Sequence, residues 1–118
     1  MDRELALEIF ESLASGVRLD VYRLLVKEGP GGLVAGELAS TLGLPATNLS
    51  FHLKALTHAS LVTATQEGRF QRYRANLAPM AGLVAYLTEE CCGGRPGLCG
   101  ELPLVVGCPP VREPRESA

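Results

Sequence analysis

Tryptophan is absent from this 118-residue chain, and aromatic residues make up only 5% of it. Hydrophobic residues account for 47% of the sequence, so the core must be built mainly from leucine, valine and alanine. Cysteine is absent from the first 90 residues, which confines any thiol chemistry to the C-terminal end. A chain of this length is expected to form one domain with one modest core.

Long hydrophobic runs are also lacking. No run approaches the ~20 apolar residues of a membrane-spanning helix, and the N-terminal Met1-Asp2-Arg3-Glu4 lacks the apolar centre of a signal peptide. We therefore expect a cytoplasmic protein with no membrane partner. The sequence contains no nucleotide-binding loop and no base poised beside a cysteine, so we do not expect an enzyme.

The chain also lacks an overall excess of positive charge, since its net charge is −2. Such an excess would indicate a nucleic-acid-binding protein. The distribution of charge is more informative. Residues 1–40 carry four basic and seven acidic groups, and residues 81–118 carry three and five. Residues 41–80 carry four basic groups and the single acidic residue Glu67, a net charge of +3. This local basic region matters more for phosphate contact than the total charge.

The stretch from Leu33 to Leu61 predicts two short helices. Apolar residues recur there in steps of three and four, at Leu38, Ala39 and Leu42 and then at Leu49, Leu53 and Leu56. A break at Gly43-Leu44-Pro45 separates the two runs. Two helices joined in this way form a helix-turn-helix, in which the second helix enters the major groove of DNA. This stretch alone is also compatible with an ordinary helical hairpin that has a polar surface.

The segments around this stretch favour the first interpretation. Helices are predicted over residues 2–14, 17–27 (with Ser15 as N-cap) and 77–90, and period-two alternation predicts a β-hairpin over residues 61–73 that turns at 66–69. A helix-turn-helix followed by a hairpin with a basic tip is typical of a winged helix, although such a hairpin can also merely cap the core. The predicted fold is mainly α with a small β-hairpin. The first and last helices offer more apolar surface than one small domain buries, so we expect a homodimer through them.

Seven side chains are predicted to contact operator DNA. Small polar and hydrogen-bonding groups suit the edges of bases, and cations suit phosphates. The four residues expected to face the groove are Thr47, Asn48, Ser50 and His52, and the three expected to hold phosphates are Lys54, Arg69 and Arg72.

In combination, these motifs strongly resemble the ArsR/SmtB family of bacterial metal-sensing repressors, over roughly residues 10–90. The matching positions are Leu13, Ala14, Arg18 and Leu19; Glu37, Leu38, Ala39, Leu42, Gly43 and Leu44; Ser50, His52, Leu53 and Leu56; Leu61 and Val62; and Glu67, Gly68 and Arg69. The resemblance implies a winged-helix homodimer that represses its own operon and leaves DNA when its ligand binds.

Two ligand sites known in the family are missing here. One family arsenic site is a Cys-Val-Cys run before Asp/Glu-Leu, and this chain has Val34-Ala35-Gly36 before Glu37-Leu38. A family zinc site uses carboxylates and histidines of the last helix, and residues 77–90 contain no histidine and no aspartate. The ligand must therefore bind elsewhere, or it is not a metal.

The four cysteines all lie between residues 91 and 108, spaced C-C-x6-C-x8-C. Clustered cysteines in a cytoplasmic protein suggest metal binding or redox chemistry. Gly93 and Gly94 let the chain turn back, so Cys91, Cys92 and Cys99 are the predicted ligands. Three thiolates suit a soft ion, and arsenite or antimonite binds three sulfurs in a pyramid. The vicinal pair Cys91-Cys92 alone could hold methylarsenite, whose methyl group takes one of the three positions on arsenic. Several arsenic sensors that resemble this chain carry a cysteine pair at the end of the last helix.

Two alternatives stay open for the cysteines. A zinc-responsive repressor would take Cys108 as a fourth ligand, although the spacing is not that of a zinc ribbon. A thiol-redox repressor is the other, although Glu89, Glu90 and the negative helix end disfavour a reactive thiolate.

We expect residues 1–92 to form the DNA-binding and dimerisation domain. Residues 93–118, with five glycines and five prolines, form a tail that contributes ligand cysteines.

Overall fold

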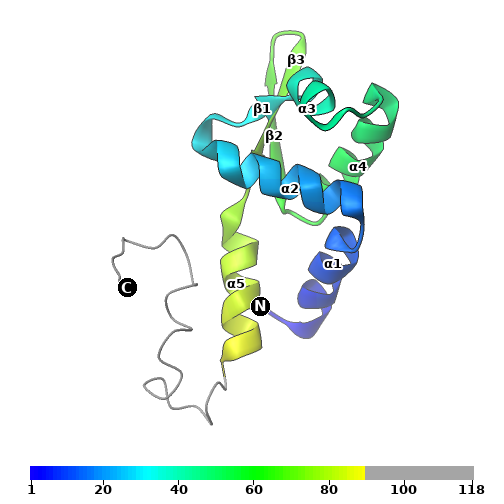
Figure 1. Cartoon of the computed structure of the whole chain (residues 1–118). Helices are drawn as coiled ribbons and strands as arrows, with labels where there is room; N and C mark the ends of the chain where they lie inside the picture. The colour runs from blue at the N-terminus through cyan, green and yellow to red at the C-terminus, as the bar shows by residue number, and fades with distance from the viewer. Residues whose placement is uncertain (90–118) are drawn as a thin grey trace, which may run out of the picture.

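The computed structural model describes residues 1–89 of the chain; residues 90–118 lie outside the description. It is a helical domain with a small antiparallel sheet (Figure 1). In chain order the elements are α1 (Arg3–Leu13), α2 (Gly16–Glu28), the short 3-10 helix η1 (Gly29–Gly31), β1 (Leu33–Val34), α3 (Ala35–Leu42), α4 (Ala46–His58), β2 (Val62–Glu67), β3 (Phe70–Ala75) and α5 (Leu77–Thr88). The winged helix-turn-helix predicted from the sequence is confirmed. None of the helices within residues 1–89 is long and apolar enough to cross a membrane.

Capping residues set the ends of the helices. The Asp2 carboxylate accepts a hydrogen bond from the backbone N–H of Leu5 at 2.8 Å, and the Ser15 hydroxyl accepts one from the N–H of Arg18 at 3.4 Å. Each satisfies an N–H that the first turn of a helix leaves unpaired. Gly43 ends α3 in the left-handed conformation, at φ 65°, which glycine adopts without steric cost. The break between α3 and α4 therefore lies where the sequence predicts it.

The sheet has three strands in the order β1-β3-β2, one more than the hairpin predicted from the sequence. The hairpin itself is present, with Glu67 opposite Phe70 at its tip. The additional strand, β1, pairs with β3 through Leu33 opposite Tyr73 and Val34 opposite Arg72. The hairpin prediction was therefore incomplete. A strand of two residues is too short to show any periodicity, and only its partner strand defines it.

The core lies between the helices and the base of the hairpin, and it is aliphatic, as the composition requires. Tyr22 is the only aromatic side chain in the buried core of residues 1–89. The fully buried side chains come from α1, α2, α3, α4, the α4–β2 connection and β2 and are Ile9, Val21, Leu25, Leu38, Leu49, Leu53, Leu56, Leu61 and Val62. This core holds α4 in place and leaves its opposite face in solvent.

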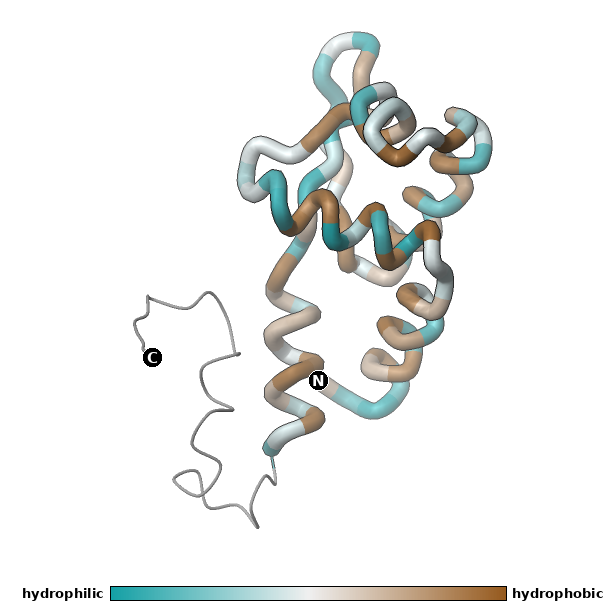
Figure 2. The backbone as a smooth tube through the Cα atoms, viewed as in Figure 1, coloured by the Kyte–Doolittle hydropathy of each residue, from teal (hydrophilic) through white to brown (hydrophobic). Residues whose placement is uncertain are grey.

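Helices α1 and α5 keep large apolar side chains in water. Leu7 and Phe10 lie three residues apart on α1 and are 54% and 46% exposed, while on α5 only Leu83 is buried and Leu87 is 57% exposed. Hydrophobic shades run along most of α5, which extends below the rest of the domain in Figure 2. Both helices thus leave large apolar side chains uncovered in the single chain.

A single residue, Asn76, connects β3 to α5. Its backbone N–H donates to the carbonyl oxygen of Leu61 at 2.9 Å, and its side-chain amide donates to the carbonyl oxygen of Ser60, also at 2.9 Å. Ser60 and Leu61 are the two residues between α4 and β2 that follow Ala59. The start of α5 is therefore fastened to the end of α4 and to the base of the hairpin.

Candidate nucleic-acid interface

The outer face of α4 is polar and carries no negative charge. Leu49, Leu53 and Leu56 turn inward and are at most 2% exposed. No aspartate or glutamate occurs between Glu37 and Glu67. Four of the predicted DNA-contacting side chains lie exposed on this helix: Thr47, Asn48, Ser50 and Lys54. Hydrogen-bonding groups without carboxylates are what a surface needs to approach the polyanionic backbone and the base edges of DNA.

His52 differs from these four because it is half-buried and turned toward α2. Its Nδ1 accepts a hydrogen bond from Arg18 Nε at 3.2 Å, and Arg18 Nη1 donates to the carbonyl oxygen of Ser12 at 3.2 Å. Because Nδ1 is an acceptor, the neutral ring carries its proton on Nε2, which leaves that N–H as the group able to donate to DNA. Arg18 therefore ties α4 to the end of α1 and fixes the tautomer of His52.

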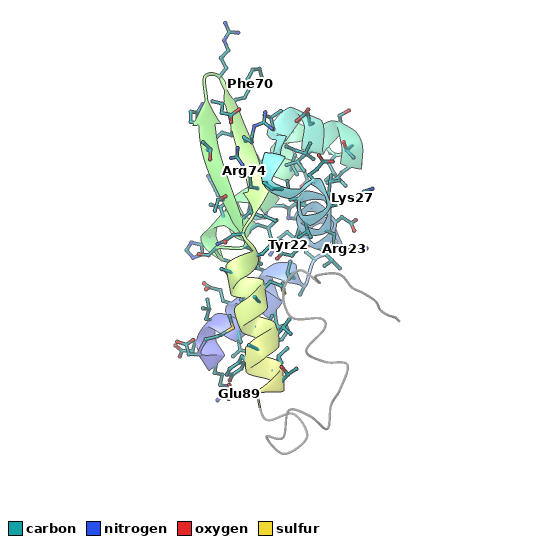
Figure 3. All side chains as sticks on the ribbon, turned by 90° about the vertical axis from the view of Figure 1, so that its left-hand side faces the viewer. Tyr22, Arg23, Lys27, Phe70, Arg74 and Glu89 are labelled. Atoms are coloured by element: carbon teal, nitrogen blue, oxygen red, sulfur yellow. The ribbon has the colours of Figure 1, made fainter. Side chains whose placement is uncertain are left out.

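The tip of the hairpin carries a cation and an aromatic ring. Arg69 is exposed. Phe70 beside it is 61% exposed, and Figure 3 shows Phe70 at the tip of the hairpin. The turn is made by Gly68 at φ 61°, and the Gln66 side-chain amide donates to the Gly68 carbonyl oxygen at 2.8 Å. These contacts stiffen the tip, so that Arg69 projects from a defined end of the hairpin.

Arg72 and Arg74 lie on one face of β3 and hold the hairpin to η1. Arg72 donates to Glu67 at 3.0 Å and to the Gly31 carbonyl oxygen at 3.1 Å. Arg74 donates to the Pro30 carbonyl oxygen at 2.8 Å and to the Thr65 hydroxyl at 3.2 Å. The exposed pair with Glu67 contributes little stability, and a phosphate can take the place of that carboxylate. Phosphate contact by Arg72 remains a prediction, and the structure shows that this side chain also anchors the hairpin.

Sequence reasoning missed three residues that the structure brings to this surface. Arg18 is 34 positions away from His52, and no local pattern joins the two. Arg74 is predictable from the sequence, because residues two apart on a strand share a face and Arg72 is a predicted phosphate contact. Phe51 is 67% exposed on α4, and the helical periodicity places it opposite the buried leucines. A search for hydrogen-bonding groups passes over Phe51 because its side chain is apolar.

The predicted ligands Cys91, Cys92 and Cys99 lie outside the described residues, as do Cys108 and the predicted boundary between residues 92 and 93. Within residues 1–89 no group of three or more histidine, cysteine, aspartate or glutamate side chains is placed to hold a metal ion. The cysteine site therefore stays a prediction from the sequence.

Comparison with known proteins identifies the family. A helix-turn-helix domain model matches residues 13–64. The transcriptional regulator CmtR of Mycobacterium tuberculosis is 36% identical over 93 residues, which cover 72% of this chain and 79% of CmtR. This chain belongs to the ArsR/SmtB family of winged-helix transcriptional regulators. Its family is one of regulators, which are not enzymes.

Solved structures of other ArsR/SmtB-like proteins share the fold. An ArsR-like transcriptional regulator from Rhodococcus sp. RHA1 superposes with a TM-score of 0.67 at 23% identity, covering 89% of this chain and 96% of its own. The domain Mb0332 of Mycobacterium bovis, described as a homodimeric winged helix-turn-helix DNA-binding domain, superposes with a TM-score of 0.59 at 30% identity. It covers 74% of this chain and 81% of its own.

This ArsR/SmtB chain differs from the family pattern where the resemblance would place an arsenic site. Val34 ends β1, and Ala35 and Gly36 begin α3. None of the three has a side chain that can ligate a metal. Glu37 is instead used locally, because its carboxylate accepts a hydrogen bond from the Val34 N–H at 3.0 Å and so caps α3.

Proposed function

We propose that this protein is a homodimeric DNA-binding repressor that leaves its operator when trivalent arsenic or antimony binds its C-terminal cysteines. The observation that carries the DNA-binding part is the outer face of α4, where exposed Thr47, Asn48, Ser50 and Lys54 meet no carboxylate of their own helix. Asparagine can pair with adenine, serine and threonine can contact any base, and lysine and arginine neutralise phosphates.

In this proposal α4 lies in the major groove and the hairpin reaches the neighbouring backbone. Arg69, exposed at the tip of the hairpin, contacts phosphates or the minor groove. Two such domains, related by a two-fold axis, would place their recognition helices about 34 Å apart, one turn of DNA. The operator is then a two-fold symmetric sequence upstream of the repressed genes.

The apolar surface of α1 and α5 supports the dimer. Leu7, Phe10 and Leu87 are each about half exposed in the single chain, so burying the remaining exposed part of one such side chain contributes roughly 1 kcal/mol, about half of the value for full burial. A symmetric interface buries each of them twice. The homodimeric M. bovis domain of the same fold adds support.

The position of the cysteines in the sequence supports their role in release. Cys91 follows Thr88, the last residue of α5, by three positions, and all four cysteines occur between residues 91 and 108. A ligand that joins Cys91 and Cys92 to Cys99 acts next to the end of a proposed dimer helix. A coupling free energy of about 1–3 kcal/mol would weaken DNA binding about 5- to 150-fold.

The test is fluorescence anisotropy of the reduced protein on labelled DNA from upstream of its own gene, titrated with arsenite. We expect release with arsenite and antimonite but not with zinc or peroxide. Cys91→Ser and Cys92→Ser are expected to bind DNA normally and to ignore arsenite, while Cys108→Ser, the matched control, still responds. Release of the Cys91 and Cys92 variants by arsenite would overturn the ligand assignment. Release of wild type by peroxide or zinc alone would replace it with a redox or zinc sensor.

A further inference from the structure

Phe51 is the most exposed large hydrophobic side chain within residues 1–89, at 67%. It lies on the outer face of α4, opposite the leucines that anchor the helix. Its ring contacts the ring of the adjacent His52, with centroids 5.6 Å apart and planes inclined at 72°. Removing Phe51 would therefore take almost nothing from the core, and its place on the helix calls for an explanation outside the folding of the single chain.

The neighbours of Phe51 indicate what it meets. Thr47 and Lys54, four residues before it and three after it, flank it on the same face of α4, and both are exposed. Phe51 thus lies between two residues proposed to contact DNA. It also lies on a shallow groove whose other wall includes Glu8 and Glu11 of α1. The phenyl ring has no charge and no hydrogen-bonding group with which to hold a phosphate, so an apolar group on the edge of a base is the better partner for it.

Only one base offers an apolar group in the major groove. The C5-methyl group of thymine lies there, and phenylalanine is one of the side chains that contact it. We infer that Phe51 is a specificity-determining residue that packs on the C5-methyl group of a thymine in each half of the operator. This inference rests on the proposed function, because it takes α4 to be the helix that enters the major groove.

Replacing thymine with deoxyuridine tests the contact, because it removes the methyl group and leaves base pairing unchanged. The labelled upstream DNA is prepared once with thymine and once with deoxyuridine throughout, and the reduced dimer is titrated onto each. Burying one methyl-sized group is worth a factor of about four in affinity. Wild type is therefore expected to bind the uracil duplex about fourfold more weakly per half-site, or roughly 16-fold for both half-sites.

Three variants make the experiment specific. Phe51→Ala is expected to bind both duplexes with nearly the same affinity, close to that of wild type on the uracil duplex. Phe51→Leu keeps an apolar side chain and is expected to keep most of the preference for thymine. Phe70→Ala is the matched control, because it removes a similarly exposed phenylalanine, 61% exposed, from the hairpin. It is expected to keep the full preference. Far-UV circular dichroism verifies that each variant is folded.

The outcomes separate the inference from the function on which it rests. A preference for thymine in wild type that disappears in Phe51→Ala supports the contact. An equal preference in wild type and Phe51→Ala overturns it, while DNA binding itself stands. If wild type binds neither duplex more tightly than a scrambled duplex, the proposed function fails, and this inference fails with it.

Discussion

Gly32 is the glycine at which one added methyl group is expected to lower the free energy of unfolding most. It is buried between η1 and β1, at φ 63° and ψ −169°, a backbone conformation that only glycine adopts readily. A Cβ atom there would lie 2.2 Å from the Tyr73 carbonyl oxygen and 2.7 Å from Arg74 Cγ. The nearer atom is backbone of β3, so it cannot move aside like the end of a flexible side chain.

The expected cost of Gly32→Ala has two parts. Holding an alanine in this conformation costs roughly 1–3 kcal/mol. Relieving the clash requires β1 and β3 to separate where Leu33 pairs with Tyr73, which adds the loss of at least one backbone hydrogen bond, about 1 kcal/mol. We expect the free energy of unfolding to fall by roughly 2–4 kcal/mol, which is large for a single methyl group.

Urea denaturation followed by circular dichroism measures this change, at one fixed protein concentration because a dimer's stability depends on concentration. Gly36→Ala is the matched control. Gly36 lies in α3 with nothing within 4 Å of an added Cβ, so alanine there is expected to stabilise the protein by about 0.5–1 kcal/mol. If Gly32→Ala were as stable as wild type, the close approach of Gly32 to β3 would be wrong.

Three further perturbations probe the contacts around the recognition helix and the dimer. Replacing Arg18 with Gln removes the donor to His52, and we expect about 1–2 kcal/mol less unfolding free energy in urea; the cost should shrink if His52 is already alanine. Leu7→Glu is expected to convert the dimer to monomer in sedimentation, whereas Val26→Glu, the control on α2, leaves it dimeric. Burial raises the pKa of Tyr22 above its usual 10.0, so the stability from its protonated hydroxyl is complete below pH 10 and lost as pH rises further. Tyr22→Phe is expected to flatten that alkaline decline in unfolding free energy.

Local sequence patterns were enough to predict the helices. The steps of three and four that put Leu49, Leu53 and Leu56 on one stripe also decide which face of α4 remains in solvent. Ser15 and Gly43 mark helix ends because their chemistry suits caps whatever the tertiary structure. The hairpin followed from alternation and from a glycine at its turn.

The remaining features depend on contacts between distant parts of the chain. The pairing of β1 with β3 and the bond from Arg18 to His52 join segments that no periodicity connects. The anchoring of Arg72 to the Gly31 carbonyl oxygen is of the same kind, since backbone acceptors look alike in any sequence. The exposure of Phe51 was implied by the helical pattern but carried no obvious chemistry. The assignment of Cys91 and Cys92 as ligands rests on the sequence alone.

The one-residue link at Asn76 bears on how a regulator of this kind can evolve, because it separates the residues that set half-site spacing from those that set base preference. Because Asn76 donates hydrogen bonds to the carbonyl oxygens of both Ser60 and Leu61, we expect α5 to move together with the DNA-facing elements. Substitutions along α5 can therefore change the relative orientation of the two domains in the dimer without altering any base contact. This orientation determines the half-site spacing that the dimer accepts. Substitutions on the outer face of α4 change the bases preferred without altering the spacing. Sequence preference and spacing preference can thus drift independently in descendants of this protein.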